Sequence, residues 1–236
     1  MTKDDSADIS IVMPCFNYAS YIAEAIGSIF AQGIEKVQVV VVDDGSTDAS
    51  AEIALGLDPR VECIRQANAG QAAARNAGIG RARGKYLAFL DADDVWTSGS
   101  LAARLDALRD GRECVYGASE AFLSPELTNA ERQRLGSVPP AMTGRLPGTM
   151  LIVREAFDRV GPFDSALKLG EMFDWVARAD KARITVAMMD RIVLRRRIHG
   201  GNTSIRLKGD NREYLKALRA SLQHRREALP GSGGAP

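Results

Sequence analysis

The chain has 236 residues, 45% of them hydrophobic and 26% charged, with a net charge of +1 at pH 7. This composition is ordinary for a soluble globular protein, and the length suits one α/β domain, with or without a small appendage. No apolar stretch approaches the roughly 18 residues needed to cross a bilayer. The acidic start, residues 1–5, does not resemble a secretory signal peptide.

The first half of the chain alternates strand-like and helix-like segments. Apolar runs cover residues 9–13, 37–42, 61–64 and 85–90, and helical patterns cover 20–31, 48–57 and 70–82. Runs that are apolar on both faces are typical of central strands in a parallel sheet. Short connections between alternating elements predict an open, mostly parallel, twisted α/β sheet flanked by helices, as in Rossmann-like folds.

Beyond Trp96 the pattern is looser. Helices are expected over residues 98–109, 154–160 and 171–180, and strands over 114–119, 148–153, 184–188 and 192–198, with an irregular region at 119–147. The three cysteines, Cys15, Cys63 and Cys114, are widely spaced and form no CxxC pair. An odd count without metal-ligand spacing predicts reduced thiols and a cytoplasmic location.

The C-terminal part is strongly basic. Residues 191–236 contain 11 Lys or Arg and 3 Asp or Glu, a net charge of +8, whereas residues 1–190 carry −7. A last helix is expected from about 210 to 228, with leucines on one side, before a flexible Gly-rich tail. This helix either meets an anionic membrane surface peripherally, at the inner face of a membrane, or is a solvated or sheet-packed helix.

Polar side chains follow three of the first-half strands. The first strand runs into "PCFN" (14–17), the second into "DDGSTD" (43–48) and the fourth into "DADD" (91–94). Ligands of open α/β sheets bind at the carboxyl ends of the strands, so these turns predict one site. Like charges crowded beside an apolar run need a cation, and Asp-x-Asp oxygens suit a divalent ion such as Mg²⁺ or Mn²⁺.

These segments carry a family resemblance. "ISIVMPCFN", "VVVVDDGSTD", "NAGQAAARNAGIGRARGKYLAFLDADD" and "RVGPFD" resemble, in order and spacing, the family 2 glycosyltransferases of the GT-A fold. The similarity is close over 9–96 and looser over 148–204. It implies transfer of a sugar from a nucleotide-diphosphate donor, usually with inversion and a divalent metal. The chain then divides into a tail (1–8), a nucleotide-sugar-binding half (9–96), an acceptor and catalytic half (97–209), and a basic C-terminal helix with its tail (210–236).

The resemblance also assigns the metal site. Asp91 and Asp93 match the family's DxD pattern, with Asp93 as the main metal ligand and Asp91 at the ribose or a metal-bound water. His199, in "RRRIHGGNTS", resembles a histidine that lies near the metal and diphosphate in relatives. Asp94 serves either in this acidic loop or as a cap for the following helix.

The donor nucleotide is assigned to the first two turns. By resemblance, Asp43 or Asp44, with Asp44 preferred, accepts a hydrogen bond from the base imide, which favours a UDP-sugar. Pro14, Phe16 and Asn17 would line the base pocket. Taken alone, "DDGSTD" is equally a turn that starts a helix.

A cation and a base complete the expected site. Arg75, on a helix opening near residue 70, either meets the donor phosphates or pairs with acids. Inverting transfer needs a general base, which relatives often place in a G-E-D-x-D pattern. This chain has Met172 where the pattern has aspartate, so Glu171 is the preferred base and Asp174 the second, unless both are ordinary first-turn acids.

Two functions stay open at this stage. One is an active metal-dependent transferase acting on an unidentified saccharide, lipid-linked or peptide acceptor. The other is a nucleotide-sugar-binding partner without turnover, which Met172 favours. A Rossmann oxidoreductase is disfavoured because no GxGxxG follows the first strand. No nucleic-acid partner is expected.

Overall fold

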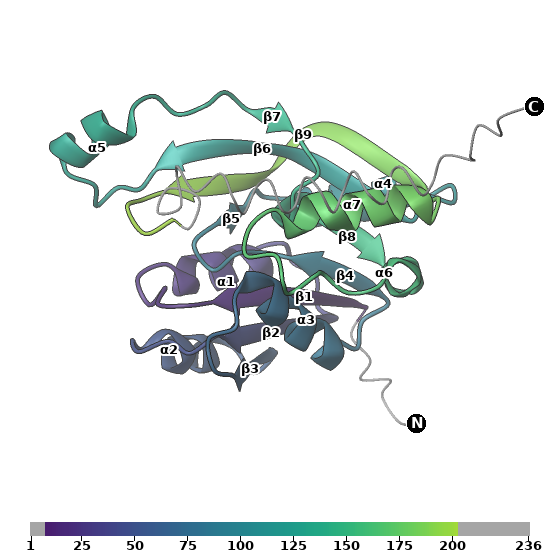
Figure 1. Ribbon diagram of the computed structural model, residues 1–236, viewed down its shortest axis with the longest axis horizontal. Helices are drawn as coiled ribbons and strands as arrows, with labels where there is room; N and C mark the ends of the chain where they lie inside the picture. Colours follow the sequence, from purple (N-terminus) through teal and green to yellow (C-terminus); the bar gives the residue numbers. More distant parts are fainter. Residues whose placement is uncertain (1–7, 203–236) are drawn as a thin grey trace, which may run out of the picture.

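A computed structural model describes residues 8–202 as one twisted sheet with helices on both faces (Figure 1). The strand order is β3-β2-β1-β4-β8-β6-β9-β5, with β7 paired to β6. The strands are β1 (Ile9–Cys15), β2 (Val37–Asp43), β3 (Val61–Arg65), β4 (Tyr86–Phe89), β5 (Val95–Trp96), β6 (Cys114–Leu123), β7 (Met142–Thr143), β8 (Met150–Val153) and β9 (Val186–Ile198). The helices are α1 (Ile22–Phe30), α2 (Ser50–Leu57), α3 (Gln71–Arg81), α4 (Ser100–Ala107), α5 (Asn129–Leu135), α6 (Arg154–Val160) and α7 (Glu171–Lys181), with a 3₁₀ turn at Pro147–Thr149.

The parallel part of the sheet is its first half. Strand β1 pairs in parallel with β2 and β4, and β2 pairs in parallel with β3. The carboxyl ends of these strands therefore share one edge, as expected. The second half is mixed: β8 is antiparallel to β4 and β6, whereas β9 runs parallel to β6 and antiparallel to β5.

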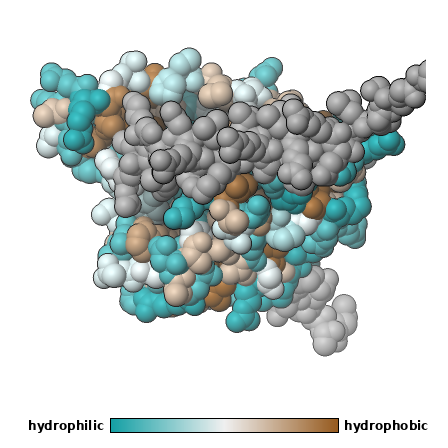
Figure 2. All heavy atoms as spheres, viewed as in Figure 1, coloured by the Kyte–Doolittle hydropathy of each residue, from teal (hydrophilic) through white to brown (hydrophobic). Residues whose placement is uncertain are grey.

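The sheet separates two apolar layers. Alternate residues of β1 point to opposite faces, so Ile11 and Met13 pack with α1 and α4 while Val12 packs with α3, α6 and α7. Polar residues predominate in the coloured part of the face shown in Figure 2, with small apolar patches between them. This sandwich of helices around a buried sheet is the α/β architecture that the strand pattern predicts.

Helix α3 lies very close to the sheet because Gly78 faces it. A Cβ atom at Gly78 would lie 2.4 Å from Cγ1 of Val12 and 3.1 Å from Cγ2 of Val42. Only glycine permits this approach. The close packing sets α3 against β1 and β2, so that the start of the helix reaches the edge where these strands end.

The second half differs from the sequence expectation in three places. The two strands expected at 184–188 and 192–198 are one strand, β9. It includes the polar residues Asp190 and Arg191, and its pairing with β6 has a bulge at this point. The irregular region 119–147 contains the end of β6, α5 and β7, and the short β5 was not expected. The expected helix at 210–228 lies outside the described residues. Among residues 8–202, no helix has the length and hydrophobicity to cross a bilayer.

Candidate active site

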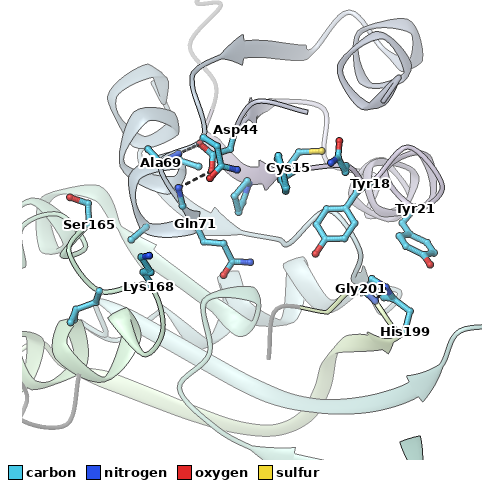
Figure 3. A pocket seen from close by; sticks show the side chains of 18 of the residues that line it. Cys15, Tyr18, Tyr21, Asp44, Ala69, Gln71, Ser165, Lys168, His199 and Gly201 are labelled. Atoms are coloured by element: carbon cyan, nitrogen blue, oxygen red, sulfur yellow. Dashed lines mark hydrogen bonds between the residues drawn. The ribbon is translucent and has the colours of Figure 1, made fainter. Parts of the chain in front are cut away.

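A cavity of about 850 Å³ lies at the carboxyl ends of β1 and β2 (Figure 3). Asp44 and Ala69 stand on one side, Ser165 and Lys168 face them from the segment before α7, and Tyr18, Tyr21 and His199 close a third side. The lining residues are Pro14, Cys15, Phe16, Asn17, Tyr18, Ser20, Tyr21, Asp44, Asn68, Ala69, Gly70, Gln71, Ala72, Ala74, Ser165, Leu167, Lys168, His199 and Gly201. Five of the predicted site residues are among them: Pro14, Phe16, Asn17, Asp44 and His199.

The loops after β1 and β2 are bonded to each other at the cavity. The Asn17 backbone N–H donates to Oγ of Ser46 at 2.9 Å, and Oδ1 of Asn17 accepts from the Thr47 backbone at 2.8 Å. Asn17 adopts a φ of 59°, a left-handed conformation that asparagine tolerates. The fixed loop leaves Phe16 38% exposed, with its ring available to a ligand.

Asp44 binds the loop that leads into α3. Its Oδ1 accepts from Nε2 of Gln66 at 2.7 Å and from the Ala69 backbone at 2.8 Å, and its Oδ2 accepts from the Gly70 backbone at 2.8 Å. Asp43 is turned away from the cavity. It is 1% exposed, accepts from the Ser46 backbone at 2.8 Å and pairs with Arg65 at 3.0 Å.

Arg75 is the cation nearest the acidic segment 91–94. Its Nη2 donates to Oδ1 of Asp91 at 2.7 Å, and its Nη1 donates to Oε1 of Glu171 at 2.5 Å. The residue is 1% exposed. Of the two arrangements that the sequence left open, the structure therefore has Arg75 paired with acids, and the pair joins α3 to the start of α7.

His199 and Asn202 both contact Asp93. Nε2 of His199 and Nδ2 of Asn202 each lie 3.1 Å from Oδ2 of Asp93. The Gly201 backbone N–H donates to Nδ1 of His199 at 3.1 Å, so in the neutral ring Nε2 carries the hydrogen and donates to Asp93. In this arrangement the His199 ring is held directly against the Asp93 carboxylate.

Asp94 is buried behind Asp93. Its Oδ1 accepts from the Arg197 backbone at 2.9 Å. Burial, followed by the charges of Asp93 and Asp91, raises the pKa of Asp94 well above its usual range. The Arg197 side chain donates to the Asp93 carbonyl at 3.0 Å and to Glu24 at 2.5 Å, so this guanidinium is already paired.

Comparison with known proteins decides the family. The family model described as "Glycosyl transferase family 2" matches residues 10–162. The chain belongs to this family. An uncharacterized glycosyltransferase of Rickettsia prowazekii is 28% identical over 87% of this chain and 69% of its own length. One of Nostoc sp. is 46% identical, over 37% of this chain and 29% of its own length.

Solved structures share the fold of this family 2 chain. The structure of S. aureus TarS 1-349 in complex with UDP-GlcNAc superimposes with a TM-score of 0.74 at 18% identity, covering 92% of this chain and 66% of that one. Mannosyltransferase PcManGT from Pyrobaculum calidifontis, in complex with GDP-Man and Mn²⁺, gives 0.65 at 19% identity, covering 98% and 66%. The GT-A type fold expected from the sequence is thus confirmed. The chain spans about two thirds of either structure.

The two candidate bases lie in different ion pairs. Glu171, 8% exposed, is held by Arg75 beside Asp91, whereas Asp174, 2% exposed, pairs with Arg178 at 2.9 Å one turn further along α7. Met172, which stands where the family pattern has an aspartate, packs in the apolar cluster that contains Trp175. It is a core residue and cannot act as the base. Of the two carboxylates, Glu171 is the one joined to the acidic segment.

Asp91 and Asp93 supply carboxylate oxygens, the kind of ligand that a divalent cation takes. Among residues 8–202, no three His, Cys, Asp or Glu side chains are grouped to hold a metal. Within the described residues the carboxylate of Asp91 is bonded only through Oδ1, to Arg75, which leaves Oδ2 for a cation. Mg²⁺-type ions commonly take one or two carboxylates and complete their shell with substrate phosphates and water. Asp91 and Asp93 are two carboxylates of this kind.

Several contact residues were missing from the sequence prediction. Asn202 and Gln66 bind Asp93 and Asp44, and Gln71 and Lys168 line the cavity. Asn202 follows His199 by three residues in "RRRIHGGNTS", and this short spacing is the sequence signal that could have identified it. Lys168 stands between α6 and α7 in a segment without a motif.

Proposed function

We propose that this protein transfers a sugar from a nucleotide-diphosphate donor, with a UDP-sugar preferred, to an acceptor hydroxyl. The observation that carries the proposal is the continuity of the site. The cavity lined by Phe16 and Asp44 ends at His199, which contacts Asp93 directly. A nucleotide bound along it would have its base at the β1 and β2 loops and its diphosphate at the carboxylates.

The base pocket supports a uracil donor. Asp44 receives three hydrogen bonds from the protein, and a carboxylate has about four acceptor positions. The remaining position would accept the imide N–H of uracil, while Phe16 supplies an apolar face for the ring. TarS is described with UDP and with UDP-GlcNAc, but PcManGT is described with GDP-Man, so guanosine donors belong in any test.

The chemistry we propose is a single inverting displacement. A divalent ion, Mn²⁺ or Mg²⁺, at Asp91 and Asp93 would stabilise the negative charge that grows on the departing nucleoside diphosphate. Glu171 would accept the proton of the acceptor hydroxyl through Oε2, because Arg75 binds its Oε1. Arg75 positions this base relative to Asp91.

Titration calorimetry of UDP with and without MnCl₂ tests the proposal. Wild type should bind UDP more tightly with Mn²⁺, and Asp93→Asn should lose the metal effect. Asp106→Asn, an exposed acid on α4, is the matched control and should behave as wild type. Absence of UDP and GDP binding under both conditions would contradict the proposal. Binding without donor hydrolysis or transfer would favour the second candidate, a nucleotide-binding partner. The observation in favour of that candidate is the buried Met172, at the position where the family pattern has an aspartate.

A further inference from the structure

The His199 ring is packed against two tyrosine rings. Its centroid lies 4.7 Å from that of Tyr21 and 5.9 Å, in an edge-to-face arrangement, from that of Tyr18. Figure 3 shows these three side chains gathered at one end of the cavity. The imidazole is 5% exposed, and its Nε2 lies 3.1 Å from Oδ2 of Asp93. Aromatic packing together with this polar contact therefore determines where the ring lies.

Tyr21 is itself held at its hydroxyl and at its ring. The hydroxyl donates to Oε1 of Glu126, whose other oxygen accepts from Oγ of Ser124 at 2.5 Å. Burial, followed by the hydrogen bond to Glu126, raises the pKa of Tyr21 to about 12, so the hydroxyl stays protonated near neutral pH and can donate. The guanidinium of Arg197, a residue that is 4% exposed, lies 5.0 Å from the ring centre. Tyr21 is thus a fixed surface against which the imidazole packs.

The orientation of Asp93 depends on His199. Both His199 and Asn202 bind the same oxygen of Asp93, Oδ2, and these two contacts limit rotation of the carboxylate. Outer groups of this kind set the direction in which a ligand faces a metal, and loss of one typically lowers metal affinity about 10–100-fold. A side chain that keeps His199 in place therefore acts on Asp93 as well.

We propose that Tyr21 is a positioning residue that keeps His199 in contact with Asp93 and thereby orients this carboxylate for the divalent ion. The inference rests on the proposed function, because it takes Asp93 as a metal ligand. Of the two tyrosines, Tyr21 is closer to His199 and is the one whose hydroxyl binds Glu126. Its effect is transmitted through the imidazole, and the connection after β6, which carries Glu126, supports the metal site from outside the cavity.

The test measures Mn²⁺ binding in the presence of UDP, by electron paramagnetic resonance of free Mn²⁺ with UDP alone as the blank, and uridine binding by ligand-detected NMR. Tyr21→Leu removes the ring that contacts His199, and Tyr21→Phe keeps it. Tyr86→Leu is the matched control, because Tyr86 is also half-buried but begins β4, at the opposite end of that strand from Asp91. Both leucine variants should lower Tm, so a Mn²⁺ effect confined to Tyr21→Leu does not come from lower stability. Tyr21→Leu is also measured in a His199→Ala background.

We expect Tyr21→Leu to raise the Kd for Mn²⁺ about tenfold or more, with the Kd for uridine within about twofold of wild type. Tyr21→Phe should stay within about threefold and Tyr86→Leu within about twofold. In the His199→Ala background, Tyr21→Leu should change the Kd for Mn²⁺ by less than about twofold, because the group through which it acts is gone.

Three results would overturn the inference and leave the proposed function standing. Tyr21→Leu could bind Mn²⁺ as tightly as wild type, could lose uridine affinity to the same extent as Mn²⁺ affinity, or could have its full effect without the His199 imidazole. If wild type itself binds no Mn²⁺ in the presence of UDP, the inference and the metal site of the proposed function are both wrong.

Discussion

Replacing Arg75 by methionine tests the ion-pair bridge at the centre of the site. The substitution keeps a long apolar side chain but removes the only cation bound to Asp91 and Glu171 among the described residues. Because Glu171 is 8% exposed, its charge would be left in a poorly solvated position. The change should therefore lower both stability and activity.

The size of the effect follows from burial. Removing one partner of a buried pair costs about 3–5 kcal/mol. The Asp91 side chain is 29% exposed and can be solvated, so Glu171 accounts for most of the loss. We expect the free energy of unfolding to fall by about 3–4 kcal/mol and, at roughly 2–4 °C per kcal/mol for a chain of this size, Tm to fall by about 10 °C.

Urea unfolding followed by circular dichroism measures this loss. Arg83→Met is the control, because Arg83 pairs with Glu62 on the surface, where the side chains are 61% and 37% exposed, and should cost less than about 1 kcal/mol. Adding Glu171→Gln to Arg75→Met should restore at least half of the loss. A single Arg75→Met variant as stable as Arg83→Met would refute the assignment of the bridge.

Three further predictions concern packing, catalysis and thiol reactivity. Gly78→Ala should cost about 1–3 kcal/mol by overpacking against β1, whereas Gly80→Ala on the same helix, with open space at its Cβ, should be neutral or stabilising; equal melts would contradict the close packing. Glu171→Gln should lower kcat at least about 100-fold with little change in UDP affinity; an unaffected rate would place the base elsewhere. Burial raises the pKa of Cys15 to about 12 and also raises that of the half-buried Cys63. Because Cys15 is 2% exposed and Cys63 is more accessible, iodoacetamide at pH 8 should modify Cys63 before Cys15 in native protein, as peptide mapping would show.

The sheet edge was predictable from the sequence because its signals are local. Three of the four apolar runs of the first half end at a polar turn, and parallel pairing brings those turns together without further information. The second half was less predictable. The polar residues Asp190 and Arg191 break the hydrophobic pattern of β9, but backbone pairing with β6 continues past them through a bulge.

The partners of the site residues depend on tertiary contacts. Arg75 and Glu171 are 96 positions apart, and no spacing rule relates them. The same is true of Asp93 with His199 and Asn202. These two residues follow strand β9, which ends beside Asp93. Sequence patterns can name such residues, but the ion pairs that fix them arise only when α3, α7 and β9 pack around one cavity.

The proposed function requires that Asp91 and Asp93 bind a divalent ion together with a nucleotide diphosphate. Anomalous diffraction from a crystal containing Mn²⁺ and UDP measures this directly. We expect one manganese peak within bonding distance of a carboxylate oxygen of Asp93 and of the diphosphate. A bound nucleotide without that peak, or a peak away from both carboxylates, would contradict it.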